Sequence, residues 1–176
     1  IISRFEIINP YDRRHPFDNL LTLDPEDENW SWWFERCSID SETFSISFKL
    51  IRKLIKKGYK VSVRPHPNEN LEAYDKLKNI FGTLFIVDNS NNINEWLSTV
   101  SVVFGPTSSA FTNAYLEQIP IISSSKIQNF YNIKHKEQAD LLSRFDKASH
   151  TPASVKEAYN LCINPKLKPK KSTLLD

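Results

Sequence analysis

The sequence contains no methionine, and it has only three glycines and two cysteines among its 176 residues. Since the natural start codon is missing, we expect a piece of a longer protein. The glycine-rich patterns of dinucleotide enzymes and P-loop NTPases are absent, which argues against both classes. Cys37 and Cys162 lie far apart without His or Cys at metal-ligand spacing, so we expect free thiols rather than a disulfide or a zinc site.

Long apolar runs are also missing. No stretch approaches the roughly 18 consecutive apolar residues of a membrane-spanning helix, and no basic-then-apolar leader is visible. We therefore expect a soluble, cytoplasmic domain. There is no Asp-x-Asp motif after a strand, so we expect no metal and no cofactor, and the acidic run at residues 24–28 is interpreted as a solvated loop. The Gly-x-Ser-x-Gly elbow of hydrolases is absent too.

Charge is unevenly distributed along the chain. The net charge is only +2, which does not indicate a nucleic-acid binder. A basic tail at residues 164–176 carries Lys166, Lys168, Lys170 and Lys171, interrupted by prolines. One interpretation is peripheral contact with anionic lipid at the inner face of the membrane, and the alternative is a solvated tail.

From residue 40 onward the pattern alternates between helix and strand, which is typical of a parallel sheet with crossover helices. We therefore predict an α/β fold, a Rossmann-like three-layer sandwich spanning residues 40–163. The predicted strands are 59–64, 84–87, 101–104 and 120–122. The predicted helices begin near 40 (ending at Gly58), 71, 93, 107, 134 and 152.

The first 39 residues are assigned to the same domain. Residues 5–8 are the predicted first strand, and the helix after this region is predicted to begin at Asp40 or Ser41, both good capping residues. Residues 43–48 also alternate as a strand does, so that alternative stays open. Tryptophans 30, 32 and 33 with Phe34 are interpreted as an irregular segment packed on the core; stacking of a sugar on one of these rings is the alternative.

Two polar clusters follow predicted strands, where ligands bind in open parallel sheets. The first is Arg-Pro-His-Pro at residues 64–67. Arg64 and His66 each precede a proline and are pushed into extended geometry, so the imidazole is held with little freedom. His66 can then donate a hydrogen bond to a phosphate as a nucleotide leaves. The alternative is a histidine that closes a turn by bonding to backbone.

The second cluster is Gly-Pro-Thr-Ser-Ser at residues 105–109, between a strand and a helix. Thr107, Ser108 and Ser109 place three hydroxyls where backbone N–H groups lack partners, which favours an anion pocket; ordinary helix capping is the alternative. Further along this helix Asn113 and Glu117 share the face of Ser109, and an amide or carboxylate there can hold ribose hydroxyls. The alternative is a solvated face.

A second His-Pro occurs in the loop after the first predicted strand, in Arg-Arg-His-Pro at residues 13–16. Arg13 and Arg14 are fixed cations that can bind phosphate. The alternative is an ordinary surface loop.

Taken together, the order and spacing of residues 64–69, 107–109 and 120–122 resemble bacterial surface-carbohydrate biosynthesis transferases of the GT-B type. They are also similar to sialic-acid and Kdo transferases with His-Pro and Ser-Ser motifs, and to CDP-glycerol polyol-phosphate transferases. The resemblance covers about residues 40–125. It implies the C-terminal, donor-binding half of a GT-B enzyme that makes capsule or lipopolysaccharide, metal-independently.

The resemblance also implies roles. His66, as catalytic residue, and the hydroxyls of Ser108 and Ser109 contact the donor phosphate, with a CMP-sugar favoured. The acidic residue common in these families, seven positions before the proline of the last strand, is replaced by Asn113, and Glu117 is the nearest carboxylate that can substitute. The catalytic base and the acceptor site are expected in an N-terminal domain outside this chain. The alternatives are a CDP-glycerol or CDP-ribitol polyol-phosphate transferase and a non-catalytic scaffold domain.

Overall fold

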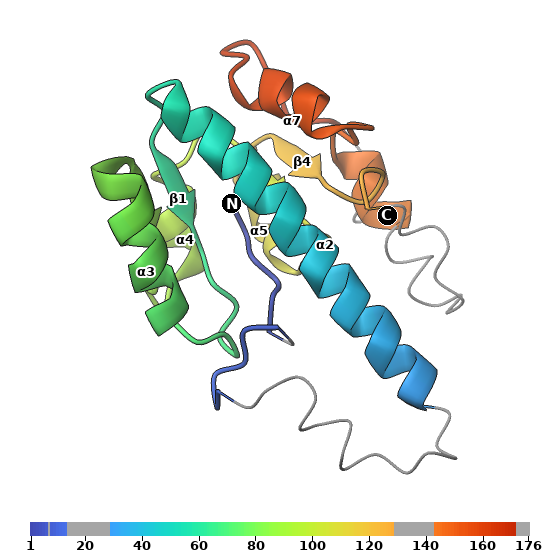
Figure 1. The fold of residues 1–176 in the computed structure, drawn as a ribbon. Helices are drawn as coiled ribbons and strands as arrows, with labels where there is room; N and C mark the ends of the chain where they lie inside the picture. The colour runs from blue at the N-terminus through green and yellow to red at the C-terminus, as the bar shows by residue number, and fades with distance from the viewer. Residues whose placement is uncertain (7, 14–28, 129–142, 172–176) are drawn as a thin grey trace.

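The computed structural model describes residues 1–6, 8–13, 29–128 and 143–171, and within them the chain is mixed α/β with short parallel strands in two small sheets (Figure 1). Strand β1 (Val61–Val63) pairs in parallel with β2 (Phe85–Val87). Strand β3 (Val103–Gly105) pairs in parallel with β4 (Ile121–Ser123). The predicted α/β class and the parallel pairing are confirmed.

Residues 1–3 lie between the two sheets and bond to both. On one side the Arg64 N–H donates to Ile1 O at 2.8 Å, and the Ser3 N–H donates to Arg64 O at 3.1 Å. On the other side the Ile2 N–H donates to Phe104 O at 2.9 Å. The bridge from Ile2 to Arg64 is parallel, as is a bridge from Ile122 to His150 beyond β4.

The prediction of a first strand at residues 5–8 is wrong. Strand pairing falls on Ile2, and the backbone then turns, with the Asn9 N–H donating to Phe5 O at 2.8 Å. The Phe5 ring is buried and contacts Phe44 edge to face at 5.3 Å between centroids. An apolar run therefore marked a buried turn, since burial alone does not distinguish a strand from a packed loop.

Helices cover both faces of the strands. In Figure 1, α2 (Asn29–Lys56) and α7 (Val155–Cys162) cross in front, while α4 (Ile93–Leu97) and α5 (Ala110–Leu116) lie behind. Helix α3 (Glu72–Phe81) packs beside β2 and leads into a short 3-10 turn, η1 (Gly82–Leu84). Residues 143–148 are also helical.

Alternate residues of the strands enter two separate apolar cores. Phe104 and Ile122 pack with the α2 and α7 side chains, whereas their neighbours Val103 and Ile121 pack with those of α4 and α5. Because strand side chains alternate between the faces of a sheet, β3 and β4 contribute to both cores, whereas the buried side chains Val61, Val63 and Phe85 of β1 and β2 enter only the first. Gly105 lies so close to residue 2 that an added Cβ would meet the Ile2 carbonyl oxygen at 2.7 Å.

The predicted start of the first helix at Asp40 or Ser41 is also wrong, because α2 begins at Asn29 and includes the aromatic segment assigned to an irregular stretch. The side-chain hydroxyls of Ser41 and Thr43 donate to the carbonyls four residues earlier, both at 2.8 Å. Asp40 is buried and forms an ion pair with Arg36 one turn back, at 3.5 Å. Residues that look like helix starters are thus satisfied inside the helix.

The remaining helices lie close to their predicted positions. The Asn92 side chain accepts the Asn94 N–H at the start of α4, as predicted. Ser154 caps α7 by accepting the Glu157 N–H at 3.2 Å. The predicted helix near residues 134–145 falls mostly outside the described residues. The described part of the chain contains no helix long and apolar enough to cross a membrane.

Candidate functional site

Three loops meet at the carboxyl edge of the strands. One follows residues 1–3 and begins with Arg4, one follows β1 at residues 64–67, and one follows β3 at residues 105–109. Parallel strands present all their carboxyl ends at the same edge, so these loops are neighbours. The Arg4 guanidinium donates to Thr107 O at 3.2 Å, which joins the first loop to the third directly.

The His-Pro loop is organised around a buried carboxylate, that of Glu69. Its Oε1 accepts the Ser3 hydroxyl at 2.8 Å, the Phe5 N–H at 3.0 Å and the His66 N–H at 3.2 Å. Its Oε2 accepts the Tyr74 hydroxyl. Glu69 is 1% exposed, so a single carboxyl holds together the N-terminal segment, the His-Pro loop and α3.

Burial raises the pKa of the Glu69 carboxyl, and the hydrogen bonds from Tyr74, Phe5, Ser3 and His66 oppose that rise. Burial likewise raises the pKa of the Tyr74 hydroxyl, with the neighbouring Glu69 carboxylate adding to it. Desolvation disfavours the charged form of both groups, so the phenol keeps its proton and remains a donor.

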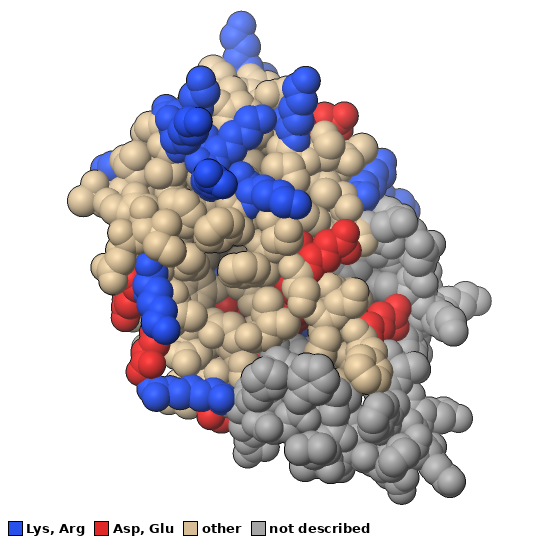
Figure 2. Space-filling model, in the orientation of Figure 1, with Lys and Arg blue, Asp and Glu red and all other residues tan. Residues whose placement is uncertain are grey.

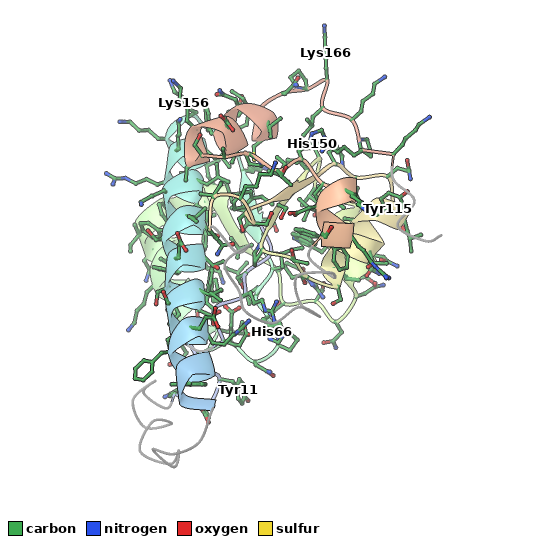
Figure 3. All side chains as sticks on the ribbon, turned by 90° about the vertical axis from the view of Figure 1, so that its right-hand side faces the viewer. Tyr11, His66, Tyr115, His150, Lys156 and Lys166 are labelled. Carbon is green, nitrogen blue, oxygen red and sulfur yellow. The ribbon has the colours of Figure 1, made fainter. Side chains whose placement is uncertain are left out.

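His66 is half-buried, and its ring accepts a hydrogen bond from the Asn68 N–H at Nδ1, at 3.3 Å. His66 therefore closes a turn by bonding to backbone, as the alternative to a phosphate-binding role predicts. This contact also fixes the ring chemistry: with Nδ1 accepting, a neutral imidazole carries its proton on Nε2, which is left as a donor. Turn closure and a role as a phosphate donor are therefore compatible. Figure 3 shows His66 at the end of the molecule where Tyr11 also lies.

Arg64 is already engaged by the protein. Its guanidinium forms an ion pair with Asp88, donates to the Ser90 hydroxyl at 3.2 Å, and donates to Ser90 O at 2.8 Å. The side chain is 17% exposed. Arg64 thus ties β1 to the loop after β2, and a ligand phosphate would have to compete with Asp88 for it.

The three hydroxyls of the loop after β3 lie in different environments. Ser108 Oγ accepts the Ala110 N–H at 3.3 Å, so it caps α5, as the capping alternative predicts. Ser109 is exposed and its side chain makes no capping bond. Thr107 is 6% exposed, and its hydroxyl has no hydrogen-bond partner among the described residues. Buried hydroxyls are normally bonded, so the Thr107 hydroxyl departs from the rule, as Ser47 Oγ also does.

Asn113 and Glu117 follow Ser109 along the polar face of α5, as the spacing predicts, while Ala110, Phe111 and Ala114 are buried. The Asn113 amide donates to the Asn94 side chain of α4 at 3.4 Å. Glu117 is exposed and forms the C-terminal cap of α5, at the opposite end of the helix from Ser108.

Arg13 belongs to a segment that lies against the His-Pro loop. The Tyr11 N–H donates to Asn68 O at 2.8 Å, and the Asn70 N–H donates to Asn9 O at 3.0 Å. This segment therefore lies beside the His-Pro loop. The Arg13 guanidinium itself pairs with Glu72 at the surface. Arg14 lies outside the described residues.

A cavity in the described part of the chain lies away from this edge. It encloses about 750 Å³ between α4 and the strands, and its lining includes Ser62, Trp96 and Cys162. None of the residues predicted to bind substrate lines it. Its walls are partly apolar and also carry Asp88, Ser90 and Glu95. Trp96 Nε1 donates to the Ser62 hydroxyl at 2.8 Å in its lining.

Two residues of this edge were not predicted from the sequence. Arg4 follows the first strand directly, but a strand placed at residues 5–8 puts Arg4 before it rather than after it. Glu69 lies within the motif at residues 64–69, but the sequence predicts no role for it. Its hydrogen bonds depend on Ser3 and Phe5, which are far away in sequence.

No group of three or more His, Cys, Asp or Glu that could hold a metal ion is found in the parts of the chain described above. In comparisons with known proteins, the chain matches no family model, no curated protein and no solved structure.

Proposed function

We propose that the chain is the donor-binding domain of a metal-independent glycosyltransferase that uses a nucleotide-activated sugar, with a CMP-sugar favoured, in surface polysaccharide synthesis. The observation that carries this proposal is the meeting of three strand-end loops at one edge, where Arg4 is bonded to Thr107 O and His66 keeps Nε2 as a donor. A cation, an imidazole N–H and hydroxyls are groups that bind phosphate.

The proposal includes a Rossmann-like arrangement. If residues 1–3 are counted as the first strand and His150 marks the last, the hydrogen bonds give the spatial order β2, β1, residues 1–3, β3, β4, residue 150. In chain order this is 3-2-1-4-5-6, the order of doubly wound dinucleotide folds. In such sheets ligands bind where the order reverses, which here lies between residues 1–3 and β3.

Arg4 and Thr107 stand at that point of reversal. The Arg4 side chain is 42% exposed, and its Nε lies 3.6 Å from the Glu6 carboxylate. The remaining N–H groups of the guanidinium can therefore donate to a phosphate. We assign to Arg4 the stabilisation of charge on the leaving nucleotide, to His66 a second hydrogen bond to it, and to Ser108 and Thr107 the remaining polar contacts. The catalytic base and the acceptor are assigned to a further domain.

The test is calorimetric titration of the chain with CMP, CDP, UDP and GDP, repeated on Arg4→Ala, His66→Ala and Ser108→Ala. Hydrogen bonds to a charged group contribute about 1.5–3 kcal/mol, so each variant is expected to bind the preferred nucleotide about 10- to 150-fold more weakly. Lys76→Ala, at an exposed position of α3, is the matched control and should bind as the parent does.

Absence of binding at millimolar concentration of every nucleotide would contradict the proposal and favour the scaffold alternative. Protection from thermal unfolding by CDP-glycerol or CDP-ribitol, but not by any CMP-sugar, would instead favour the polyol-phosphate transferase.

A further inference from the structure

The end of the molecule opposite the candidate site carries many of its positive charges. Figure 2 shows Lys and Arg gathered over the end where, in Figure 1, the last turns of α2 and the helix α7 lie. Two stretches of the sequence, residues 43–68 and 158–175, contain no Asp or Glu. We define the basic face by its cations on α2, on the turn after it, on α7 and on the tail: Lys49, Arg52, Lys53, Lys56, Lys57, Lys60, Lys156, Lys166, Lys168, Lys170 and Lys171.

The fold brings these separate segments together. Helices α2 and α7 pack against each other, and Lys53 Nζ lies 4.2 Å from the centre of the Tyr159 ring of α7. The tail is held too, because Leu167 packs on the main core and a ring nitrogen of His150 lies 2.9 Å from Lys168 O. The chain at residues 167 and 168 is therefore held against the fold, and the neighbouring lysines are exposed beside it.

None of these cations forms an ion pair in the described parts of the chain. The ion pairs found there involve Arg4, Arg13, Arg36, Arg64 and Lys78, none of which belongs to the basic face. Apart from Lys53, which is half-buried against Tyr159, the cations of the face are exposed. Glu157 of α7 lies among them, but the cations outnumber it. Like charges gathered together repel one another, so the arrangement favours an anionic partner.

We propose that the basic face docks the chain on an anionic lipid surface. Two observations favour a membrane over a nucleic acid. Arg52 is the single arginine of the face, whereas recognition of nucleic-acid phosphates favours the planar fork of arginine. Tyr59, between Lys57 and Lys60, is 44% exposed at the turn after α2, the kind of side chain that settles at the headgroup level of a bilayer.

Docking by this face would leave the candidate site accessible. Figure 3 places Lys156 and Lys166 at one end of the molecule and His66 at the other. The chain would therefore sit with the carboxyl edge of its strands facing away from the lipid. This inference does not depend on the proposed function, because it rests on charges that lie outside the candidate site.

The experiment is sedimentation of the chain with vesicles of phosphatidylcholine alone or with about one-third phosphatidylglycerol, at about 0.1 M salt and at about 0.5 M salt. Binding is expected to the phosphatidylglycerol vesicles only, and to fall sharply at the higher salt. Each lysine near an anionic surface contributes about fivefold in partitioning. The triple variant Lys56→Gln, Lys57→Gln, Lys170→Gln should therefore bind about 100-fold more weakly.

A matched triple variant, Lys76→Gln, Lys78→Gln, Lys126→Gln, makes the same change in net charge at exposed positions outside the basic face. It should lose less than about tenfold, because exposed charges act weakly beyond a Debye length. Equal losses in the two variants would overturn the proposal, and so would no binding to the anionic vesicles. Tighter binding to duplex DNA or to polyglutamate than to the vesicles would overturn it as well, in favour of those partners.

Discussion

The two loops that face each other across the candidate site are held in opposite ways. The His-Pro loop is built around a buried carboxylate that accepts four hydrogen bonds, and its histidine is locked by the Asn68 N–H. The loop after β3 has a buried hydroxyl without a partner among the described residues, at Thr107, and its backbone accepts a hydrogen bond from Arg4, which follows residues 1–3. Fully hydrogen-bonded networks make a structure rigid, so the His-Pro loop forms the rigid side of the site. The loop after β3 forms the other side and keeps the Thr107 hydroxyl that is unbonded among the described residues.

The largest expected effect comes from removing the carboxylate, in Glu69→Ala. The substitution removes the acceptor of the Tyr74 hydroxyl and of the Phe5 and His66 N–H groups, and it leaves the Ser3 hydroxyl only the Arg64 carbonyl at 3.3 Å. We therefore expect a loss of about 3–5 kcal/mol in the free energy of unfolding. Denaturant titration measures it. Glu69→Gln keeps an acceptor oxygen and is the control, expected to lose about 1–2 kcal/mol. Equal losses in both variants would show that charge, not bonding, holds the loop.

The pH dependence of stability tests the same carboxyl without mutation. Burial raises the pKa of Glu69 in the folded state, so the folded protein binds a proton that the unfolded chain has released. Its contribution to stability is complete below the ordinary Glu pKa of 4.5 and is lost as pH rises through the raised folded pKa. Glu69→Gln should remove this downward slope, which unfolding at a series of pH values would reveal.

The close approach of residues 1–3 to β3 depends on Gly105, which has no side chain. A methyl group there meets the Ile2 carbonyl oxygen at 2.7 Å, so Gly105→Ala should push residues 1–3 away from β3 at a cost of about 1–3 kcal/mol. Gly58→Ala is the control, because its added Cβ meets nothing within 4 Å and costs only the left-handed conformation, about 1 kcal/mol. Faster amide exchange at Ile2 is expected in the first variant alone.

The smallest effects separate the neighbouring hydroxyls of the second loop. Ser108→Ala removes the cap of α5 and should cost about 1 kcal/mol. Thr107→Val keeps the shape and removes a hydroxyl that makes no bond among the described residues, so it should be neutral within about 0.5 kcal/mol. Thermal unfolding compares them. A loss at Thr107 as large as that at Ser108 would mean that its hydroxyl is bonded in the protein.

Much of the fold from β1 onward could be predicted, because each strand is a short apolar run followed by turn residues and a capped helix. Asn92 is a cap that the local pattern predicts correctly. The region before β1 could not be predicted in this way. Ser41 and Thr43 bond to carbonyls within the helix instead of starting it, and only tertiary packing of α2 decides between the two.

For the candidate site, the strand-end positions of His66 and Ser108 were predictable, but their bonding partners were not. Arg64 follows a strand as predicted, yet it is paired with Asp88, a residue at the end of a different strand. Arg4 was not predicted because the first strand was placed at residues 5–8 instead of residues 1–3. Each of these depends on contacts between distant segments, which spacing along the chain does not encode.

The insertion of residues 1–3 between two strand pairs has a consequence for the order of folding. Strand pairs β1 with β2 and β3 with β4 each join neighbouring segments, whereas Ser3 bonds to a residue 61 positions away. Loop closure grows costlier with separation, and contacts between distant segments slow folding. The two halves can therefore assemble early, and the central three residues lock them together last, completing the candidate site in the same step.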